Sequence, residues 1–194
     1  MMNPSIVRVD DQPPQPWKNG GGTTRELLAW PDAQDWTLRI SVADITASGP
    51  FSEFAGVERW FAVLRGDGVQ LATPGSEAAT CDTTQSALHR FPGELPTWCT
   101  ALGTANRDFN LMLRSERGQL QQQPLCAAPQ LTSSADLVAL FVVDALTVQT
   151  PAAESWRVPD MALIAWENPE HHTLRLHLQP AGAPVRGWWI ELRV

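Results

Sequence analysis

The chain has 194 residues, of which 18% are charged and 43% hydrophobic, a balance typical of a compact folded protein rather than a disordered one. Its net charge is −7, from 14 basic and 21 acidic residues with no basic run, which disfavours nucleic-acid binding. No apolar run approaches the roughly 20 residues of a transmembrane helix, and residues 1–16 lack the apolar core of a signal peptide. Three cysteines without a Cys-x-x-Cys pair argue against a disulfide framework, so we expect a cytoplasmic protein without membrane association.

Short β-like runs recur between turn signals along the whole chain. The 16 prolines and 13 glycines predict many turns, and no amphipathic helix longer than about three turns is evident. The predicted strands are Ile6–Val9, Thr23–Leu28, Trp36–Ile45, Val57–Leu64, Val69–Ala72, Ser86–Phe91, Asp108–Arg114, Leu137–Val143, Ala145–Thr150, Met161–Trp166, Thr173–Leu178 and Trp188–Val194. The fold class is therefore all-β, a sandwich or a barrel.

One stretch, Gly118–Pro129, interrupts this pattern with four glutamines, two prolines and few bulky residues. Such a composition is typical of a linker. We therefore expect an N-terminal lobe over residues 1–118 that carries the ligand site. Residues 119–129 would connect it to a smaller C-terminal lobe over residues 130–194.

The richest chemistry lies in Pro16–Glu26, where three consecutive glycines stand beside cations, hydroxyls, an amide and a carboxylate. Glycines of this kind are useful where a backbone turns sharply or where its N–H groups approach another molecule. A phosphate-binding P-loop is excluded because Lys18 precedes the glycines and no helical pattern follows them. Two interpretations stay open: a loop that frames a small polar or anionic ligand, and an exposed hairpin turn with solvated charges.

Several motifs in this order resemble the HutD/Ves family. They are Trp17–Glu26, Leu38–Ile45, Gly49–Phe54 with Gly56–Arg59, Leu64–Gly66, Asp108–Met112 and His172–Arg175. The resemblance implies a cupin-like fold with two β-barrel lobes, a bicupin. It also implies a regulatory or ligand-binding role linked to histidine breakdown, since members occur among histidine-utilisation genes and as a stress-associated protein. It implies no known reaction.

The metal site of cupins can be compared position by position. The metal-binding motif of cupins contains two histidines, then a glutamate and then a glycine. Glu58 and Gly66 occupy the glutamate and glycine places, but the two histidine places fall on Ser52 and Phe54. A phenyl ring cannot ligate a metal, and a serine hydroxyl is a poor ligand for iron, manganese or zinc. The sequence therefore predicts a protein without a bound metal or other cofactor.

Alternate residues of barrel strands face the interior, which brings polar side chains from separate strands together. Arginine suits a carboxylate through two parallel hydrogen bonds, and asparagine offers both a donor and an acceptor. We expect a pocket for a small carboxylate of histidine utilisation, such as urocanate or formylglutamate, with a regulatory outcome. Its candidate residues are Lys18, Asn19, Gly20, Gly21, Gly22, Thr24, Arg25, Glu26, Arg39, Ser41, Glu58, Asp108 and Asn110.

Three alternatives stay open. Arg25, Arg39, Glu58 and Asp108 could instead form a buried ion-pair network that needs no ligand. Glu58 or Asp108 could act as an acid or base in a metal-independent enzyme acting on a small carboxylate. A homodimer could form through tryptophans, because Trp188–Trp189 on a strand should leave one ring exposed or at a contact. Arg59, whose side chain points away from that of Glu58, is expected at the surface.

Overall fold

The computed structural model describes residues 3–125, 130–181 and 185–194. Backbone contacts divide the chain into two compact units. The continuous unit is Gln12–Arg117, and the composite unit joins Met1–Asp11 to Gly118–Val194. Both are built from antiparallel strands, and the described residues include two short 3₁₀ segments, η1 (Val9–Asp11) and η2 (Ser115–Arg117). Within the described ranges no helix has both the length and the apolar character to cross a membrane.

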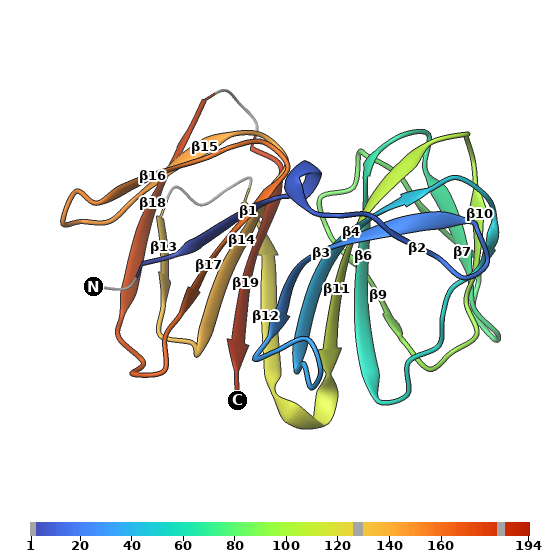
Figure 1. Cartoon of the computed structure of the whole chain (residues 1–194), viewed down its shortest axis with the longest axis horizontal. Coiled ribbons are helices and arrows are strands. Elements are labelled where there is room, and N and C mark those ends of the chain that lie inside the picture. The colour runs from blue at the N-terminus through green and yellow to red at the C-terminus, as the bar shows by residue number, and fades with distance from the viewer. Residues whose placement is uncertain (1–2, 126–129, 182–184) are drawn as a thin grey trace. The chain divides into compact units, whose positions relative to one another are not determined.

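The continuous unit contains a six-stranded sheet and a four-stranded sheet. Across the larger sheet run β2 (Gln15–Pro16), β3 (Gly22–Trp30), β4 (Leu38–Ile45), β11 (Asn106–Arg114), β6 (Val57–Arg65) and β9 (His89–Pro92). Across the smaller sheet run β5 (Gly49–Pro50), β10 (Trp98–Ala101), β7 (Val69–Ala72) and β8 (Ala79–Cys81). Figure 1 shows β3, β4, β11, β6 and β9 side by side in the larger sheet.

One face of the six-stranded sheet packs on the smaller sheet. Their shared core contains Ile45, Phe61, Val63, Val69, Leu71, Cys81, Phe91 and Cys99. Because side chains alternate between faces, the β6 residues that share a face with Phe61 and Val63 include Arg59. This alternation places a charged side chain in line with a hydrophobic core.

The composite unit has the same two-sheet plan. Its five-stranded sheet runs β1 (Ser5–Arg8), β17 (Ala162–Glu167), β14 (Leu137–Val142), β19 (Gly187–Arg193) and β12 (Gln119–Pro124). Its four-stranded sheet runs β13 (Gln130–Ser133), β18 (Leu174–Pro180), β15 (Leu146–Gln149) and β16 (Ser155–Val158). The core between them includes Trp166, Trp189, Leu140 and Leu176.

The chain is all-β as predicted, but three local expectations differ. Among the described residues the hydrogen-bonded ladders form open sheets, and neither unit closes into a barrel. The sequence Arg65–Gly68 is a turn signal that predicts a hairpin between the strands on either side of it, but here it carries the chain from the larger to the smaller sheet, with Gly66 and Gly68 at φ of 103° and 101°. Trp188 and Trp189 are both buried, so the expectation that one ring is exposed is wrong.

The stretch read as a linker also contains ordered structure. Gln119–Pro124 forms β12, which pairs with β19 along its whole length. The glutamine side chains give this segment no apolar pattern from which a strand could be predicted. The ladder instead depends on backbone N–H and C=O groups, and every residue except proline has both. Residues 126–129 lie outside the described part of the chain.

Candidate ligand-binding site

The larger sheet of the continuous unit gathers polar side chains on one face. Strand register places Ser41 of β4 opposite both Glu26 of β3 and Asn110 of β11. The same register places Met112 of β11 between Arg39 of β4 and Arg59 of β6. These residues come from separate segments of the chain, and they face the same side because each pair occupies matching positions in the pleat.

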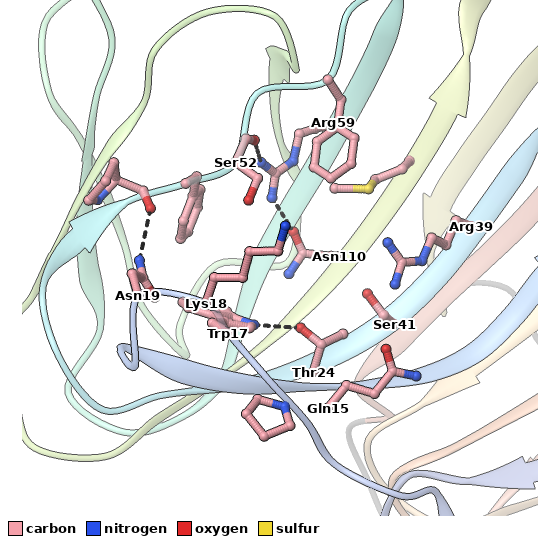
Figure 2. A pocket seen from close by; sticks show the side chains of 15 residues that line it. Gln15, Trp17, Lys18, Asn19, Thr24, Arg39, Ser41, Ser52, Arg59 and Asn110 are labelled. Atoms are coloured by element: carbon pink, nitrogen blue, oxygen red, sulfur yellow. Dashed lines mark hydrogen bonds between the residues drawn. The ribbon is translucent and has the colours of Figure 1, made fainter.

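A pocket of about 640 Å³ lies over this face. Its walls come from the sheet, from the chain before the triglycine and from the segment after β5. The lining residues are Gln15, Pro16, Trp17, Lys18, Asn19, Thr24, Arg39, Ser41, Pro50, Phe51, Ser52, Phe54, Arg59, Asn110 and Met112. Figure 2 shows Arg59, Asn110, Ser41 and Arg39 directed toward one hollow, with the Lys18 side chain extending toward Asn110.

Arg59 is the most deeply buried cation of the pocket, with 5% of its surface exposed. Its guanidinium carbon lies 5.0 Å from the ring centres of both Phe51 and Phe91 and 5.9 Å from that of Phe54. Aromatic faces attract a cation but leave its N–H groups without acceptors. Burial lowers the pKa of Arg59 to about 10, which keeps the guanidinium charged at neutral pH.

The hydrogen bonds of Arg59 leave it without a direct carboxylate partner among the described residues. Its Nη2 donates to Oδ1 of Asn110 at 2.9 Å, and its Nη1 lies 3.5 Å from the Ser52 carbonyl oxygen. Its Nε is buried and has no acceptor. A buried N–H group without an acceptor costs free energy, so an acceptor placed against this nitrogen would be stabilising.

Asp108 lies behind this contact and does not line the pocket. It is 1% exposed, and its Oδ2 accepts a hydrogen bond from Asn110 Nδ2, while its Oδ1 has no hydrogen-bond partner of good geometry in the described part of the chain. Burial raises the pKa of Asp108 well above its ordinary value, and the charge of Arg59 opposes that rise only in part.

The two other cations of the pocket differ in their pairing. Arg39 donates from Nε to Glu26 Oε2 at 2.7 Å, so a neighbouring carboxylate already offsets its charge. Lys18 is exposed and has no ion-pair partner among the described residues. Arg59 and Lys18 are therefore the cations available to an anionic ligand.

The three glycines do not line the pocket; they shape the loop that places Trp17, Lys18 and Asn19 in its wall. The N–H of Gly20 donates to the Trp17 carbonyl at 3.0 Å, and the N–H of Gly21 donates to Asn19 Oδ1 at 3.0 Å. Trp17 is in turn fixed by its indole N–H, which donates to Thr24 Oγ1 at 2.7 Å. The backbone amides of Gly20 and Gly21 are thus used within the loop.

Arg25 and Glu58 lie on the opposite face of the larger sheet. Arg25 Nη1 contacts Asp44 Oδ2 at 2.5 Å, and Arg107 Nε contacts the other oxygen of Asp44 at 2.6 Å. Glu58 accepts from Arg90 Nε at 3.0 Å. Of the predicted site residues the pocket lining therefore includes Lys18, Asn19, Thr24, Arg39, Ser41 and Asn110, while Glu26 and Asp108 support it from behind.

The cluster around Asp44 gives a first prediction. Burial alone would raise the pKa of Asp44, but hydrogen bonds and charges from Arg107 and Arg25 outweigh burial and hold it below its ordinary value. Asp44 therefore contributes stability that is present above its unfolded-state pKa and is lost as acid protonates it. We expect Asp44→Asn to lower the unfolding free energy by about 1–3 kcal/mol at neutral pH.

Urea unfolding at neutral and at acidic pH measures this difference. The gap between variant and wild type should begin to shrink as the pH falls through about 4, the pKa of an unfolded aspartate, and should close at lower pH, where Asp44 of the folded wild type also becomes neutral. An equal gap at both pH values would show that the carboxylate charge is not what stabilises the cluster.

The sequence-based site missed Arg59 and the aromatic wall formed by Trp17, Phe51 and Phe54. The expectation that Arg59 lies at the surface is wrong, because it is 5% exposed and lies opposite Met112 in the sheet; the sequence gives little sign of this, since the residues that follow Arg59 in β6 are apolar on both faces. Ser52 and Phe54, which occupy the histidine places of the cupin motif, both line the pocket. Within the described residues no three side chains of His, Cys, Asp or Glu gather closely enough to hold a metal ion.

Comparison of the sequence with known proteins identifies its family. The sequence matches HutD over residues 9–186. It is 38% identical over 138 residues to an uncharacterised protein from the hutC 3′ region of Pseudomonas putida, covering 70% of this chain and 72% of that protein. It is 30% identical over 173 residues to protein Ves of Cronobacter sakazakii, covering 87% of this chain and 89% of the relative.

Solved structures agree in fold. A protein of unknown function from Pseudomonas aeruginosa superposes with a TM-score of 0.87 at 29% identity, covering 99% of this chain and all 100% of that one. HutD from Pseudomonas fluorescens, in a formate condition, gives 0.85 at 28% identity, with 98% of each chain covered. A Bacillus subtilis oxalate decarboxylase, at 9% identity and a TM-score of 0.58 over 96% of this chain and 76% of that one, shares the cupin-like fold alone. On the extent of these matches, the chain belongs to the HutD/Ves family.

Proposed function

We propose that the pocket of the continuous unit binds a small carboxylate-bearing metabolite of histidine utilisation, of the urocanate or formylglutamate type, and that its occupancy has a regulatory outcome. The observation that carries this proposal is Arg59, a buried cation that faces the pocket and has no carboxylate partner among the residues that the structure describes. Arg59 and Lys18 supply the charge, and Asn110 supplies an amide beside them. Met112 and the rings of Trp17, Phe51 and Phe54 suit the apolar part of such a ligand.

The gene location of one relative supports the same ligand class. The Pseudomonas putida relative is named for its place in the hutC 3′ region, which associates the family with histidine utilisation. The two-sheet plan of each unit further leads us to propose that this chain is a bicupin, with the ligand site in the continuous unit.

Titration calorimetry with urocanate and with formylglutamate tests the proposal. We expect saturable heat with at least one of them, and none with the dimethyl ester of formylglutamate, because the ester keeps the formamide group but has no charge. Absence of heat with both acids at millimolar concentration would count against a carboxylate site. Equal binding of the ester would show that charge does not drive recognition.

The second candidate is a metal-independent enzyme acting on a small carboxylate. The raised pKa of Asp108 favours it, because a protonated carboxyl can act as a general acid. Asp108 is separated from the pocket by Asn110, however, and Glu58 lies on the other face of the sheet. Incubation of the protein with each acid, followed by chromatography, decides between them: turnover supports the enzyme, and unchanged compound supports binding alone.

A further inference from the structure

A continuous chain of hydrogen bonds joins the pocket to the buried carboxyl of Asp108. Arg59 Nη2 donates to Asn110 Oδ1, and Asn110 Nδ2 donates to Asp108 Oδ2. Arginine can only donate in such a chain, so the amide of Asn110 is fixed with its oxygen toward Arg59 and its nitrogen toward Asp108. Asn110 and Arg59 line the pocket, and Asp108 does not. A change at Asp108 therefore reaches a ligand only through its two partners.

Asp108 is poorly equipped to hold a negative charge. It is 1% exposed, its Oδ1 has no hydrogen-bond partner of good geometry among the described residues, and the donors that favour its charged form are neutral amides, Asn110 Nδ2 and its own backbone N–H. Burial accordingly raises its pKa well above the ordinary value. An uncharged acid leaves the full positive charge of Arg59 available to the pocket, whereas an ionised Asp108 offsets that charge from behind.

We propose that Asp108 is a positioning residue which, through Asn110, sets the net charge that Arg59 presents to the pocket, so that an anion and a proton bind together. This inference rests on the proposed carboxylate site and adds its control by pH. An anion beside Arg59 competes with an ionised Asp108 for the same cation, so each disfavours the other. A carboxylate ligand therefore drives Asp108 toward its protonated form.

Other charged and titratable groups surround Arg59 and Asp108. From β4, Asp44 on the opposite face raises the pKa of Asp108 further. The positive charge of Arg39, also from β4, lowers the pKa of Arg59. From β10, Cys99 has its own pKa raised to about 12 by burial and by Asp108, so it stays a neutral thiol. Glu26 remains paired with Arg39, and Lys18 lines the mouth.

Within the described residues, His89 of β9 is a further titratable group near this face, and burial lowers its pKa. Its ring stacks on Phe91, at 5.7 Å between ring centres, and it does not line the pocket. His89→Gln therefore serves as the matched control for any effect of pH on binding.

The experiment measures the affinity for formylglutamate from about pH 6 to about pH 9, where both of its carboxylates stay ionised. The wild-type affinity should fall as the pH rises through the pKa of Asp108, by up to about tenfold per pH unit for one linked proton. Asp108→Asn mimics the protonated acid, so its affinity should equal that of the wild type at the acidic end and stay flat. His89→Gln should keep the wild-type slope.

Proton release or uptake gives an independent readout. Mixing protein and formylglutamate in weakly buffered solution at the alkaline end should take up protons in the wild type and none in Asp108→Asn. A purely structural role would shift affinity equally at all pH values, and that result overturns the inference. So does an identical slope in the wild type and in Asp108→Asn.

A measurement without ligand keeps the inference separate from the proposed function. The infrared spectrum of the free protein at neutral pH should contain the carbonyl band of a protonated carboxylic acid, and Asp108→Asn should lack that band. Its absence from the wild type overturns the inference even if formylglutamate binds. Presence of the band with no binding of formylglutamate or urocanate supports the neutral acid and contradicts the carboxylate site instead.

Discussion

Arg59→Met is expected to weaken carboxylate binding by at least about thirtyfold, since truncating one partner of a buried charge pair costs about 2–5 kcal/mol. The substitution removes the cation while leaving an unbranched side chain among Phe51, Phe54 and Phe91, where a thioether packs well. The unfolding free energy should stay equal or rise, because a buried charge is exchanged for an apolar group. Calorimetry and urea unfolding on the same preparation measure both quantities.

Two matched variants locate the effect. Arg39→Met removes a cation of the same pocket that Glu26 already pairs, so we expect only a severalfold loss of affinity. Arg90→Met removes a cation paired with Glu58 on the other face, and binding should be unchanged. If Arg59→Met unfolds the protein, the structural ion network is the better explanation. If it binds as tightly as the wild type, the pocket does not use Arg59.

Gly22→Ala is expected to lower the unfolding free energy by about 3 kcal/mol or more. A Cβ on Gly22 would overlap the carbonyl oxygen of Asp44 on the neighbouring strand, and it would come within 3.1 Å of the Trp17 ring. Neither the strand backbone nor the ring can move away freely, because Trp17 is held by Thr24 and by the wall of the pocket. Urea unfolding measures the loss, and calorimetry should show weaker ligand binding with it.

The other two glycines provide the comparison. Gly20 has φ of 73° and open space around its Cβ position, so Gly20→Ala should cost about 1–2 kcal/mol from backbone strain alone. At Gly21 the nearest atom is Asn19 Oδ1 at 3.4 Å, an ordinary contact, and Gly21→Ala should be close to neutral. Equal losses in all three variants would contradict the assignment of separate roles.

Much of the fold could be predicted from the sequence because strongly apolar or alternating runs specify strands wherever a face is buried. Val69–Ala72 was predicted at its observed bounds, and the runs that became β4, β6 and β11 differ only at their ends. Strands such as β12 and β16 were missed because their side chains are largely polar or exposed. Their positions come from backbone pairing with a neighbour, which composition does not reveal.

The site could be predicted where one face of a strand is clearly polar. Arg39 and Ser41 alternate with apolar residues in β4, so their shared face could be read from the sequence. In β6 both faces are buried from Arg59 to Leu64, and alternation therefore gives no sign of which side holds the ligand. The cupin comparison then favoured Glu58 over Arg59, although Glu58 lies away from the pocket.

The order in which the chain is synthesised has a consequence for the composite unit. Its edge strand β1 leaves the ribosome first, yet its ladder partner β17 is made only after the whole continuous unit. Gln12–Arg117 can fold as it emerges, whereas the composite unit must wait until the last strand, β19, has been translated. A gene split after residue 117 would leave β1 on a different fragment from its partner β17. A permuted gene that begins at residue 12 and appends residues 1–11 after residue 194 would keep each unit contiguous in sequence.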